Sequence, residues 1–170
     1  TPSYAYVDLN VPYINQYDAG APMGCEAASL LEAFHYKGYA TNYDLKSFLS
    51  EMPISPDDNP YHGFVRSPWI VSNEEIFQSI FPDALISWGS KYGNVKNISG
   101  QGIEELRREL LNGNPVVIYT IYQFGYPQWQ NWFFGRVYNN MHIMTACGYN
   151  QANGQYKVAD PAGGTYWVDG

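Results

Sequence analysis

The apolar positions in the first half of the chain recur with helical spacing. Four of them follow Cys25 at i, i+3, i+4 and i+7, namely Ala27, Leu30, Leu31 and Phe34. This stripe predicts a helix that begins near Cys25, packs into the core and ends at Gly38, a residue suited to a left-handed C-terminal position. A second helix is predicted over 43–50, with Thr41 or Asn42 as its cap.

Two more helices are expected around a long loop. Residues 52–69 are rich in proline and turn formers, which is typical of an ordered loop. Ser72 and Glu75 have the spacing of a capping box, so they predict a short helix that Pro82 ends. An apolar repeat predicts another helix over 103–113, closed by its last residue, a glycine.

The second half of the chain changes to strand-like patterns. Strands are predicted over 115–121, 142–149, 155–159 and 165–168, with turns at 150–154 and 160–164. One more short strand is expected from Val7, running into a loop near Pro12. Helices first and a mainly antiparallel sheet afterwards define an α+β fold, and we expect residues 1–170 to form one domain.

Composition and charge exclude several classes of protein. Hydrophobic residues make up 45% of the chain and charged residues 15%, which favours a folded globular protein. The formal net charge of -7 disfavours binding to nucleic acid or to an anionic membrane. No apolar run has membrane-spanning length, and the two cysteines are not spaced as in zinc or redox motifs. We predict a monomer with no cofactor, no metal, no nucleic-acid partner and no membrane span.

The amino-acid usage also bears on the compartment. Sixteen Tyr, five Trp and only two Cys resemble the composition of secreted bacterial proteins. The chain starts at Thr1-Pro2-Ser3 without a signal peptide, so we expect that an export signal was removed or left out. The expected location is extracellular or at the cell surface.

Cys25 has the setting of a nucleophile. The turn formers Pro22-Met23-Gly24 lead into it, so the thiol lies at the start of the predicted helix. Unpaired amides and the positive end of the helix dipole would stabilise a thiolate there, which predicts a lowered thiol pKa. The alternative is a buried cysteine that packs as a small hydrophobic residue. Cys147 is expected to be an inert buried thiol, with a Cys25–Cys147 disulfide as the alternative.

One of the three histidines is placed to act as a base. His35 follows Cys25 on the same helix at a distance of roughly 15 Å, which excludes it. His62 lies in a loop without an orienting neighbour, so it is expected to be exposed or to order the loop. His142 begins one predicted strand and Asp160 ends the next, so antiparallel pairing would join them. A salt bridge or a turn cap is the alternative role for this pair.

Several motifs support one reading when they are taken together. They are Leu9-Asn10-Val11-Pro12-Tyr13-Ile14-Asn15-Gln16, Gly24-Cys25-Glu26-Ala27-Ala28, Gly63-Phe64-Val65, Pro115-Val116-Val117, His142 and Ala159-Asp160-Pro161. Gln16 precedes Cys25 on its loop, where a side-chain amide could bind an oxyanion beside the Cys25 backbone N–H. The combination resembles the papain-clan cysteine peptidase family related to the double-glycine leader peptidases of bacteriocin exporters.

The resemblance covers nearly the whole chain and carries its own implications. It implies a papain-like fold, Gln16 as oxyanion donor, Cys25 as nucleophile, His142 as base and Asp160 as the carboxylate that orients the base. It also implies a peptide or amide substrate and a stand-alone protein resembling those exported by Gram-positive bacteria.

The predicted function is therefore peptide hydrolysis by a cysteine peptidase through an acyl-enzyme. A cell-wall peptide, a leader peptide and a host protein all stay open as substrates. Amidase or transferase chemistry on the same fold is one alternative. Another is a non-catalytic cell-wall glycan- or peptide-binding module, because aromatic residues crowd 122–134, although packing could equally explain these rings. This segment and the 57–65 loop are expected to border the cleft.

Overall fold

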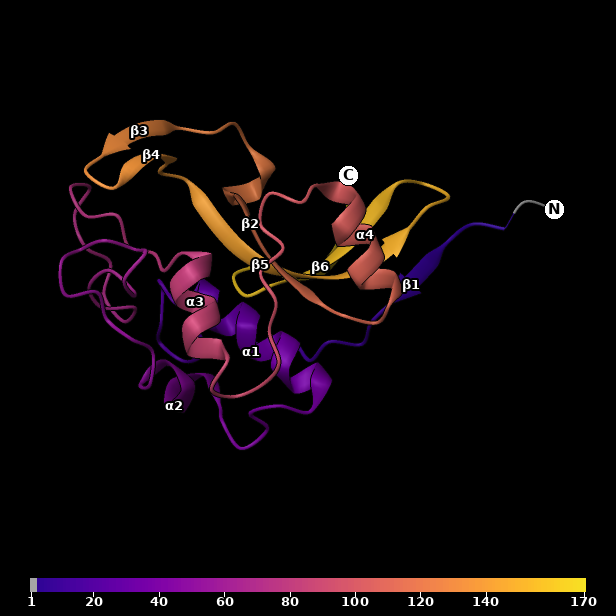
Figure 1. The fold of residues 1–170 in the computed structure, drawn as a ribbon, viewed down its shortest axis with the longest axis horizontal. Coiled ribbons are helices and arrows are strands. Elements are labelled where there is room, and N and C mark those ends of the chain that lie inside the picture. The colour runs from indigo at the N-terminus through magenta and orange to yellow at the C-terminus, as the bar shows by residue number, and fades with distance from the viewer. Residues whose placement is uncertain (1–2) are drawn as a thin grey trace.

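A computed structural model describes residues 3–170 and shows helices from the first half of the chain beside strands from the second half (Figure 1). The helices are α1 (Cys25–Lys37), α2 (Leu45–Leu49), α3 (Pro82–Gly89) and α4 (Ile103–Leu111), with a 3-10 turn at Tyr122–Phe124. The strands are β1 (Tyr6–Asp8), β2 (Val116–Ile121), β3 (Trp129–Trp132), β4 (Gly135–Tyr138), β5 (Met141–Asn150), β6 (Gln155–Asp160) and β7 (Gly164–Asp169). Thr1 and Pro2, on which the expectation of a processed start partly rests, lie outside the described residues.

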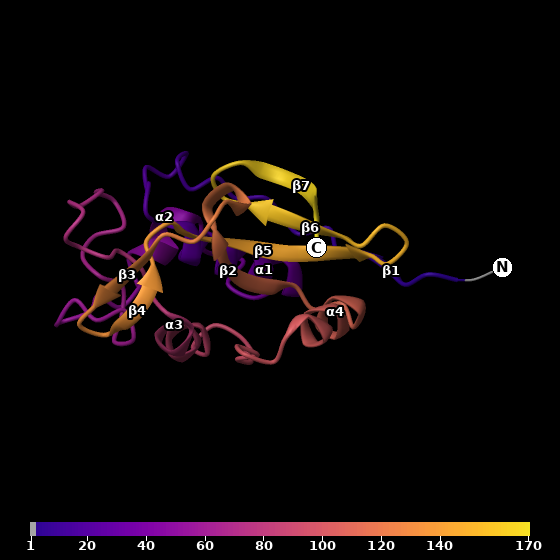
Figure 2. The same ribbon diagram turned by 90° about the horizontal axis from the view of Figure 1, so that it is seen from above.

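Strand β5 is the centre of a five-stranded sheet. Along one edge it pairs antiparallel with β2 and then with β1, and along the other with β6, which in turn pairs with β7. Eight of its ten residues are buried, which explains its continuous apolar run rather than an alternating one. Figures 1 and 2 show α1 lying along β5. The predicted α+β fold, with N-terminal helices packed on a mainly antiparallel sheet, is confirmed.

The main core fills the space between the helices and β2. Leu31 and Phe34 of α1 are buried with Phe48 of α2 and Trp88 of α3, and the Phe48 and Trp88 rings stack at 4.4 Å. Helix α1 ends where expected, since Gly38 takes a left-handed φ of 80° and its N–H caps the last turn. A second core lies around β1, β5 and β6, and α4 covers it through Leu110 and Leu106.

Helix α2 is shorter than predicted, and its cap was predicted wrongly. It begins at Leu45, and the cap is Asp44 rather than Thr41 or Asn42. The Asp44 carboxylate accepts from the Ser47 amide at 2.8 Å, and the Ser47 hydroxyl accepts from the Asp44 amide at 3.1 Å. This reciprocal pair is a capping box, and it fixes the start of the helix two residues later than the sequence pattern indicated.

The helix predicted from Ser72 and Glu75 is absent, and Pro82 begins a helix instead of ending one. The Gln78 side chain donates to the Ser67 and Ile70 carbonyls and accepts from the Ser72 amide, so it holds this segment as an irregular loop. Pro82 occupies the first turn of α3, where its fixed φ suits a helix and its missing N–H costs no hydrogen bond.

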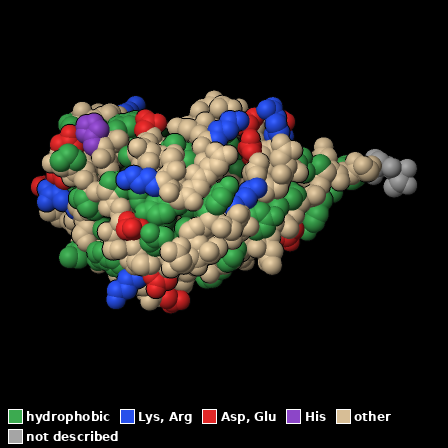
Figure 3. Space-filling model, turned by 60° about the horizontal axis from the view of Figure 1, so that its bottom comes forward, with side chains coloured by type: hydrophobic (Ala, Val, Ile, Leu, Met, Phe, Trp, Pro, Cys, Tyr) green, Lys and Arg blue, Asp and Glu red, His purple; other side chains and the backbone are tan. Residues whose placement is uncertain are grey.

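The β3–β4 hairpin, which the sequence patterns do not predict, projects beside the 52–81 loop region (Figure 1). Charged, polar and hydrophobic side chains are interspersed on the face of the molecule shown in Figure 3. Within residues 3–170, none of the helices combines the length and apolar character that crossing a membrane requires.

We expect Phe48→Ala to reduce the free energy of unfolding by about 3–5 kcal/mol, because it removes a fully buried ring and leaves a cavity against Trp88. The matched control is Phe133→Ala, whose ring is 73% exposed, and its loss should stay within about 0.5 kcal/mol. Urea unfolding of both variants measures the difference. Equal losses would contradict the assignment of the core.

Candidate active site

A cavity of about 590 Å³ opens beside the start of α1. Gln16, Cys25 and His142 line it, so three predicted site residues from distant parts of the sequence share one cavity. The other walls come from residues 71–79 and from the segment around the β3–β4 hairpin. The aromatic segment therefore borders the cavity as expected through Tyr122 and Trp132, but no residue of the 57–65 loop lines it, so that part of the prediction is wrong.

His142 and Asp160 form a buried pair behind this cavity. Their strands, β5 and β6, are antiparallel neighbours, and His142 Nε2 lies 2.6 Å from Asp160 Oδ1. The other donors to the carboxylate are the Ala162 amide at 2.9 Å and the Tyr166 hydroxyl at 2.7 Å. Burial acts to raise the pKa of Asp160, but these three hydrogen bonds outweigh it and hold the pKa below its ordinary value.

This arrangement fixes the orientation of the imidazole. Because Asp160 is a carboxylate and can only accept, Nε2 of His142 carries a proton and donates it to Oδ1. The ring of Tyr122 packs edge-on against the imidazole with a centroid separation of 5.5 Å. The His142 ring is thus held with Nε2 toward Asp160.

Cys25 is the first residue of α1, as predicted, but its thiol is not acidified. Burial raises the pKa of the thiol well above its ordinary value, and the neighbouring Glu26 charge raises it further. Backbone hydrogen bonds with Ile143, next to His142, and with Glu26 lower the pKa of the thiol, but by less than burial and the Glu26 charge raise it. The predicted lowering of the thiol pKa is therefore wrong, because desolvation and a like charge outweigh the helix N-terminus.

The disulfide alternative is excluded. Cys25 and Cys147 are both free, and Cys147 is buried in the core around β5. Burial raises the pKa of Cys147 to about 12, which makes this thiol inert as predicted.

Gln16 is buried on the loop that precedes Cys25. Its Nε2 donates to the Pro22 carbonyl at 2.7 Å, which uses one of its two N–H groups, and its Oε1 has no partner among the described residues. The Gln16 backbone N–H donates to the Pro161 carbonyl at 3.0 Å, beside Asp160. The loop with the side-chain amide is therefore tied to the turn that carries the carboxylate.

A polar seam, formed by Ser29, Glu32 and Thr145, joins α1 to β5 beneath this loop. Thr145 Oγ1 lies 2.7 Å from the Ser29 carbonyl and 3.3 Å from Glu32 Oε1, while Glu32 Oε2 accepts from the Ile14 amide at 3.2 Å. The Thr145 hydroxyl has one hydrogen, which it donates to the Ser29 carbonyl in the shorter of its two contacts. Its oxygen can then accept a hydrogen bond from a protonated Glu32. Burial raises the pKa of Glu32 to about 9, in agreement with a neutral acid.

The other two histidines lie outside the cavity. His35 bonds to the Ala40 and Tyr43 carbonyls, and His62 is an exposed loop residue whose Nδ1 lies 2.8 Å from Asp57 Oδ2. This contact agrees with the loop-ordering role predicted for His62. The prediction that His62 has no orienting neighbour is wrong, because Asp57 is that neighbour. Within residues 3–170, no group of three or more His, Cys, Asp or Glu side chains is arranged to hold a metal ion.

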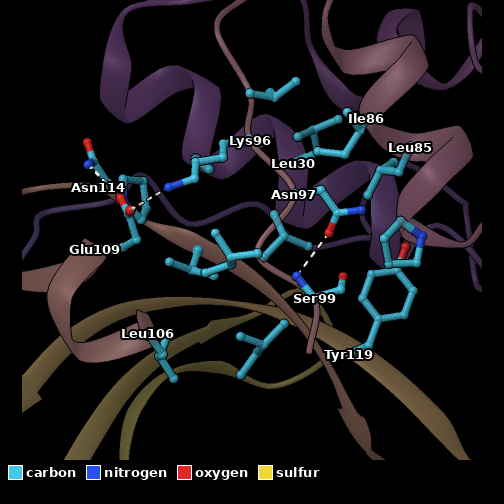
Figure 4. Close-up of a pocket in the computed structure, with 18 of the residues that line it drawn as sticks. Leu30, Leu85, Ile86, Lys96, Asn97, Ser99, Leu106, Glu109, Asn114 and Tyr119 are labelled. Carbon is cyan, nitrogen blue, oxygen red and sulfur yellow. Dashed lines mark hydrogen bonds and ion pairs between the residues drawn. The ribbon is translucent and has the colours of Figure 1, made fainter. Parts of the chain in front are cut away.

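A second cavity, of about 640 Å³, lies between α1, α3, α4 and β2 (Figure 4). Lys96 and Glu109 face each other across its wall at 3.8 Å, and apolar side chains such as Leu30 and Leu85 form much of the rest. The described residues that line it include no cysteine or histidine. Its chemistry therefore does not compete with the first cavity for the candidate active site.

No functional role was predicted from the sequence for four residues of the site: Glu26, Glu32, Ser79 and Tyr166. Two of them left a signal, because Glu26 and Glu32 place carboxylates in a predicted helix whose neighbours are mostly apolar. Ser79 and Tyr166 reach the site only through tertiary contacts, so no local pattern marks them.

The antiparallel sheet, the helix-start cysteine and the buried His142–Asp160 pair define a papain-like α+β protein. The chain belongs to the Peptidase_C39 like family, whose sequence pattern matches residues 8–169. Its fold is similar to the crystal structure of a candidate C39-like peptidase from Bacillus anthracis, with 27% identity, a TM-score of 0.83 and coverage of 97% of this chain and 88% of that chain. No curated protein matched the sequence. The family resemblance seen in the motifs is thus confirmed.

We expect Glu32→Gln to remain folded and to flatten the pH dependence of stability. The carboxyl has a pKa of about 9 when folded and about 4.5 when unfolded, so its stabilising contribution is complete below pH 4.5 and is lost as the pH rises toward 9. A glutamine supplies one acceptor for Ile14 and one donor for Thr145 at every pH. The variant should therefore gain stability relative to the wild type as the pH rises, measured by urea unfolding at pH 5, 7 and 9.

The exposed Glu75 offers a matched control for this experiment. Glu75→Gln should follow the wild-type pH curve closely. Parallel curves for Glu32→Gln and the wild type would show that Glu32 is ionised in the folded protein, contrary to the geometry of the polar seam.

Proposed function

We propose that this protein is a cysteine peptidase in which Cys25 is the nucleophile, His142 the base, Asp160 its orienting carboxylate and Gln16 an oxyanion donor. The observation that carries the proposal is the buried His142–Asp160 pair, at 2.6 Å, beside a cavity that Cys25 and Gln16 also line. Membership of a peptidase family supports the same reaction class.

The first half of the reaction forms an acyl-enzyme. His142 Nδ1 takes the Cys25 proton, and sulfur attacks the peptide carbonyl carbon, whose π electrons move to oxygen. The free N–H of the Gln16 amide and the Cys25 backbone N–H, which has no partner within the helix, stabilise this oxyanion. The C–N bond then breaks, and His142 returns the proton to the departing amine. A base is required because the thiol is neutral at rest.

The second half of the reaction releases the acyl group to water. His142 takes a proton from water, the resulting hydroxide attacks the thioester carbon, and the C–S bond breaks. Cys25 recovers its proton from His142, so the enzyme returns to its starting state. Asp160 stabilises the imidazolium at each step through the Nε2–H bond, and Tyr166 and the Ala162 amide keep Asp160 ionised.

The walls of the cavity suit a peptide substrate. Side-chain amides of Gln128, Gln130 and Asn139 offer donors and acceptors to a peptide backbone, while Phe77 and Trp132 offer apolar surface to its side chains. We propose an extracellular or cell-surface setting for this reaction, in line with the amino-acid usage.

Exposed rings near the cavity favour a second candidate function. Tyr126 is 92% exposed, Phe133 73% and Trp129 52%, so this side of the protein offers flat apolar surfaces to a sugar or a peptide. The second candidate is a binding module for cell-wall glycans or peptides that does no chemistry.

We expect Cys25→Ala to abolish the hydrolysis of a mixed peptide library and to leave the fold intact, because only the thiol is removed. Mass spectrometry of the products measures hydrolysis, since each new carboxyl terminus adds the elements of water. Cys147→Ala is the matched control and should retain activity, because Cys147 lies in the core around β5.

The same assay separates the alternatives. Products joined to an added amine would indicate transfer, and conversion of glutamine to glutamate without chain cleavage would indicate deamidation. Glycan binding that survives Cys25→Ala, with no reaction by the wild type, would favour the binding module. Normal peptide turnover by Cys25→Ala would end the proposal for Cys25.

A further inference from the structure

A second buried carboxyl group lies directly against the Cys25 thiol. Glu26 is only 2% exposed, and its Oε2 lies 3.4 Å from Cys25 Sγ. Its Oε1 accepts a hydrogen bond from the Ser79 hydroxyl at 3.0 Å, and Ser79 is itself held by a bond from the Val65 amide to its carbonyl. A buried carboxyl group is costly without such partners, so this one is fixed in place rather than accommodated loosely.

The contact matters because the thiol has one proton, which Glu26 accepts in the structure and which His142, on the wall of the same cavity, would have to accept in the proposed reaction. In the structure Cys25 donates to Glu26 Oε2, whereas peptide hydrolysis requires transfer of the same proton to Nδ1 of His142. While the thiol donates to a carboxylate, its proton is engaged away from the base, and the adjacent negative charge opposes a second one on sulfur.

We propose that Glu26 controls the ionisation of Cys25: as a carboxylate it holds a neutral thiol, and as a carboxylic acid it donates a hydrogen bond to the thiolate. The inference concerns regulation of the proposed active site and rests on Cys25 being its nucleophile. In the acid form, the Glu26 proton comes from solvent and stays on Glu26, while the Cys25 proton passes to His142. Glu26 is a positioning residue, because it acts through the thiol.

The ionisation of Glu26 falls in the range where this control would operate. Burial raises the pKa of Glu26 to about 7, against the lowering effects of its own amide, the Ser79 and Cys25 hydrogen bonds and the His142 charge. Both forms are therefore populated near neutral pH. Because Glu26 is buried, little solvent screens its charge from the half-buried Cys25 thiol that it contacts.

The other titratable groups that act on this pair are two tyrosines and His142. Tyr119 of β2 donates its hydroxyl to the Ile80 carbonyl, and Tyr17 lies on the Gln16 loop. Burial raises the pKa of both tyrosines, so they stay protonated through the neutral range. With both tyrosines protonated, Glu26 is the acid in contact with Cys25 whose charge changes near pH 7.

We expect Glu26→Gln to increase the rate at which iodoacetamide alkylates Cys25 at pH 8 by about tenfold. Removal of a like charge in contact shifts a pKa by roughly two units, which raises the thiolate fraction about a hundredfold. The lower nucleophilicity of the more acidic thiol offsets roughly half of that gain on a logarithmic scale. Peptide mapping by mass spectrometry over pH 5–9 follows Cys25 separately from Cys147.

Glu75→Gln is the control, since it neutralises an exposed carboxyl that neither lines the cavity nor contacts the thiol. It should alkylate at the wild-type rate at every pH. Alkylation of folded Glu26→Gln at or below the wild-type rate at pH 8 would overturn the proposal.

Ser79→Ala keeps the proposal testable if Glu26→Gln does not fold. Loss of the Ser79 donor should raise the pKa of Glu26, so Cys25 should alkylate faster than in the wild type near pH 7 and equally fast near pH 9. An unchanged profile would count against control by Glu26. Alkylation does not require peptide cleavage, so the two proposals can fail separately. A shifted alkylation profile without peptide hydrolysis would contradict the peptidase function but support control of the thiol by Glu26. Peptide hydrolysis with an unshifted alkylation profile would support the peptidase function but contradict control by Glu26.

Discussion

The attachment of α1 to β5 is the constraint on which the site depends. Thr145 donates to the Ser29 carbonyl at 2.7 Å, and Glu32 joins the same seam while it holds the Ile14 amide. These bonds fix the helix that begins with Cys25 against the strand that carries His142. Since β5 and β6 are antiparallel, the same strand also places His142 against Asp160. One helix–strand contact thus positions residues that are far apart in the sequence.

The structure also shows which of two opposing effects controls the thiol. A helix N-terminus stabilises a thiolate by a modest amount that solvent screens, whereas burial and a contact with Glu26 act at close range in a poorly solvated place. The second pair of effects wins, and the pKa of Cys25 rises. The proposed chemistry therefore relies on His142 as a proton acceptor rather than on a thiolate present at rest.

The fold class could be predicted from the sequence because α1 and β5 have strong apolar patterns. The pairing of His142 with Asp160 could be predicted because one turn joins β5 to β6. Prediction from the sequence failed where side chains override local pattern. Gln78 holds 72–80 as a loop through bonds to distant backbone groups, and Pro82 suits a helix start as well as a helix end. The contacts of Ser79 and Tyr166 could not be predicted, because they arise only from tertiary packing.

If Cys25 is the nucleophile and His142 its base, an activated ester should form an acyl-enzyme on Cys25. A short peptide p-nitrophenyl ester is mixed with the protein and quenched in acid within milliseconds to seconds, and peptide mapping locates the acyl group. We expect a thioester on Cys25 that forms rapidly in the wild type and at a greatly reduced rate in His142→Ala. Ester turnover without acylation of Cys25, or equally fast acylation without His142, would contradict these two roles.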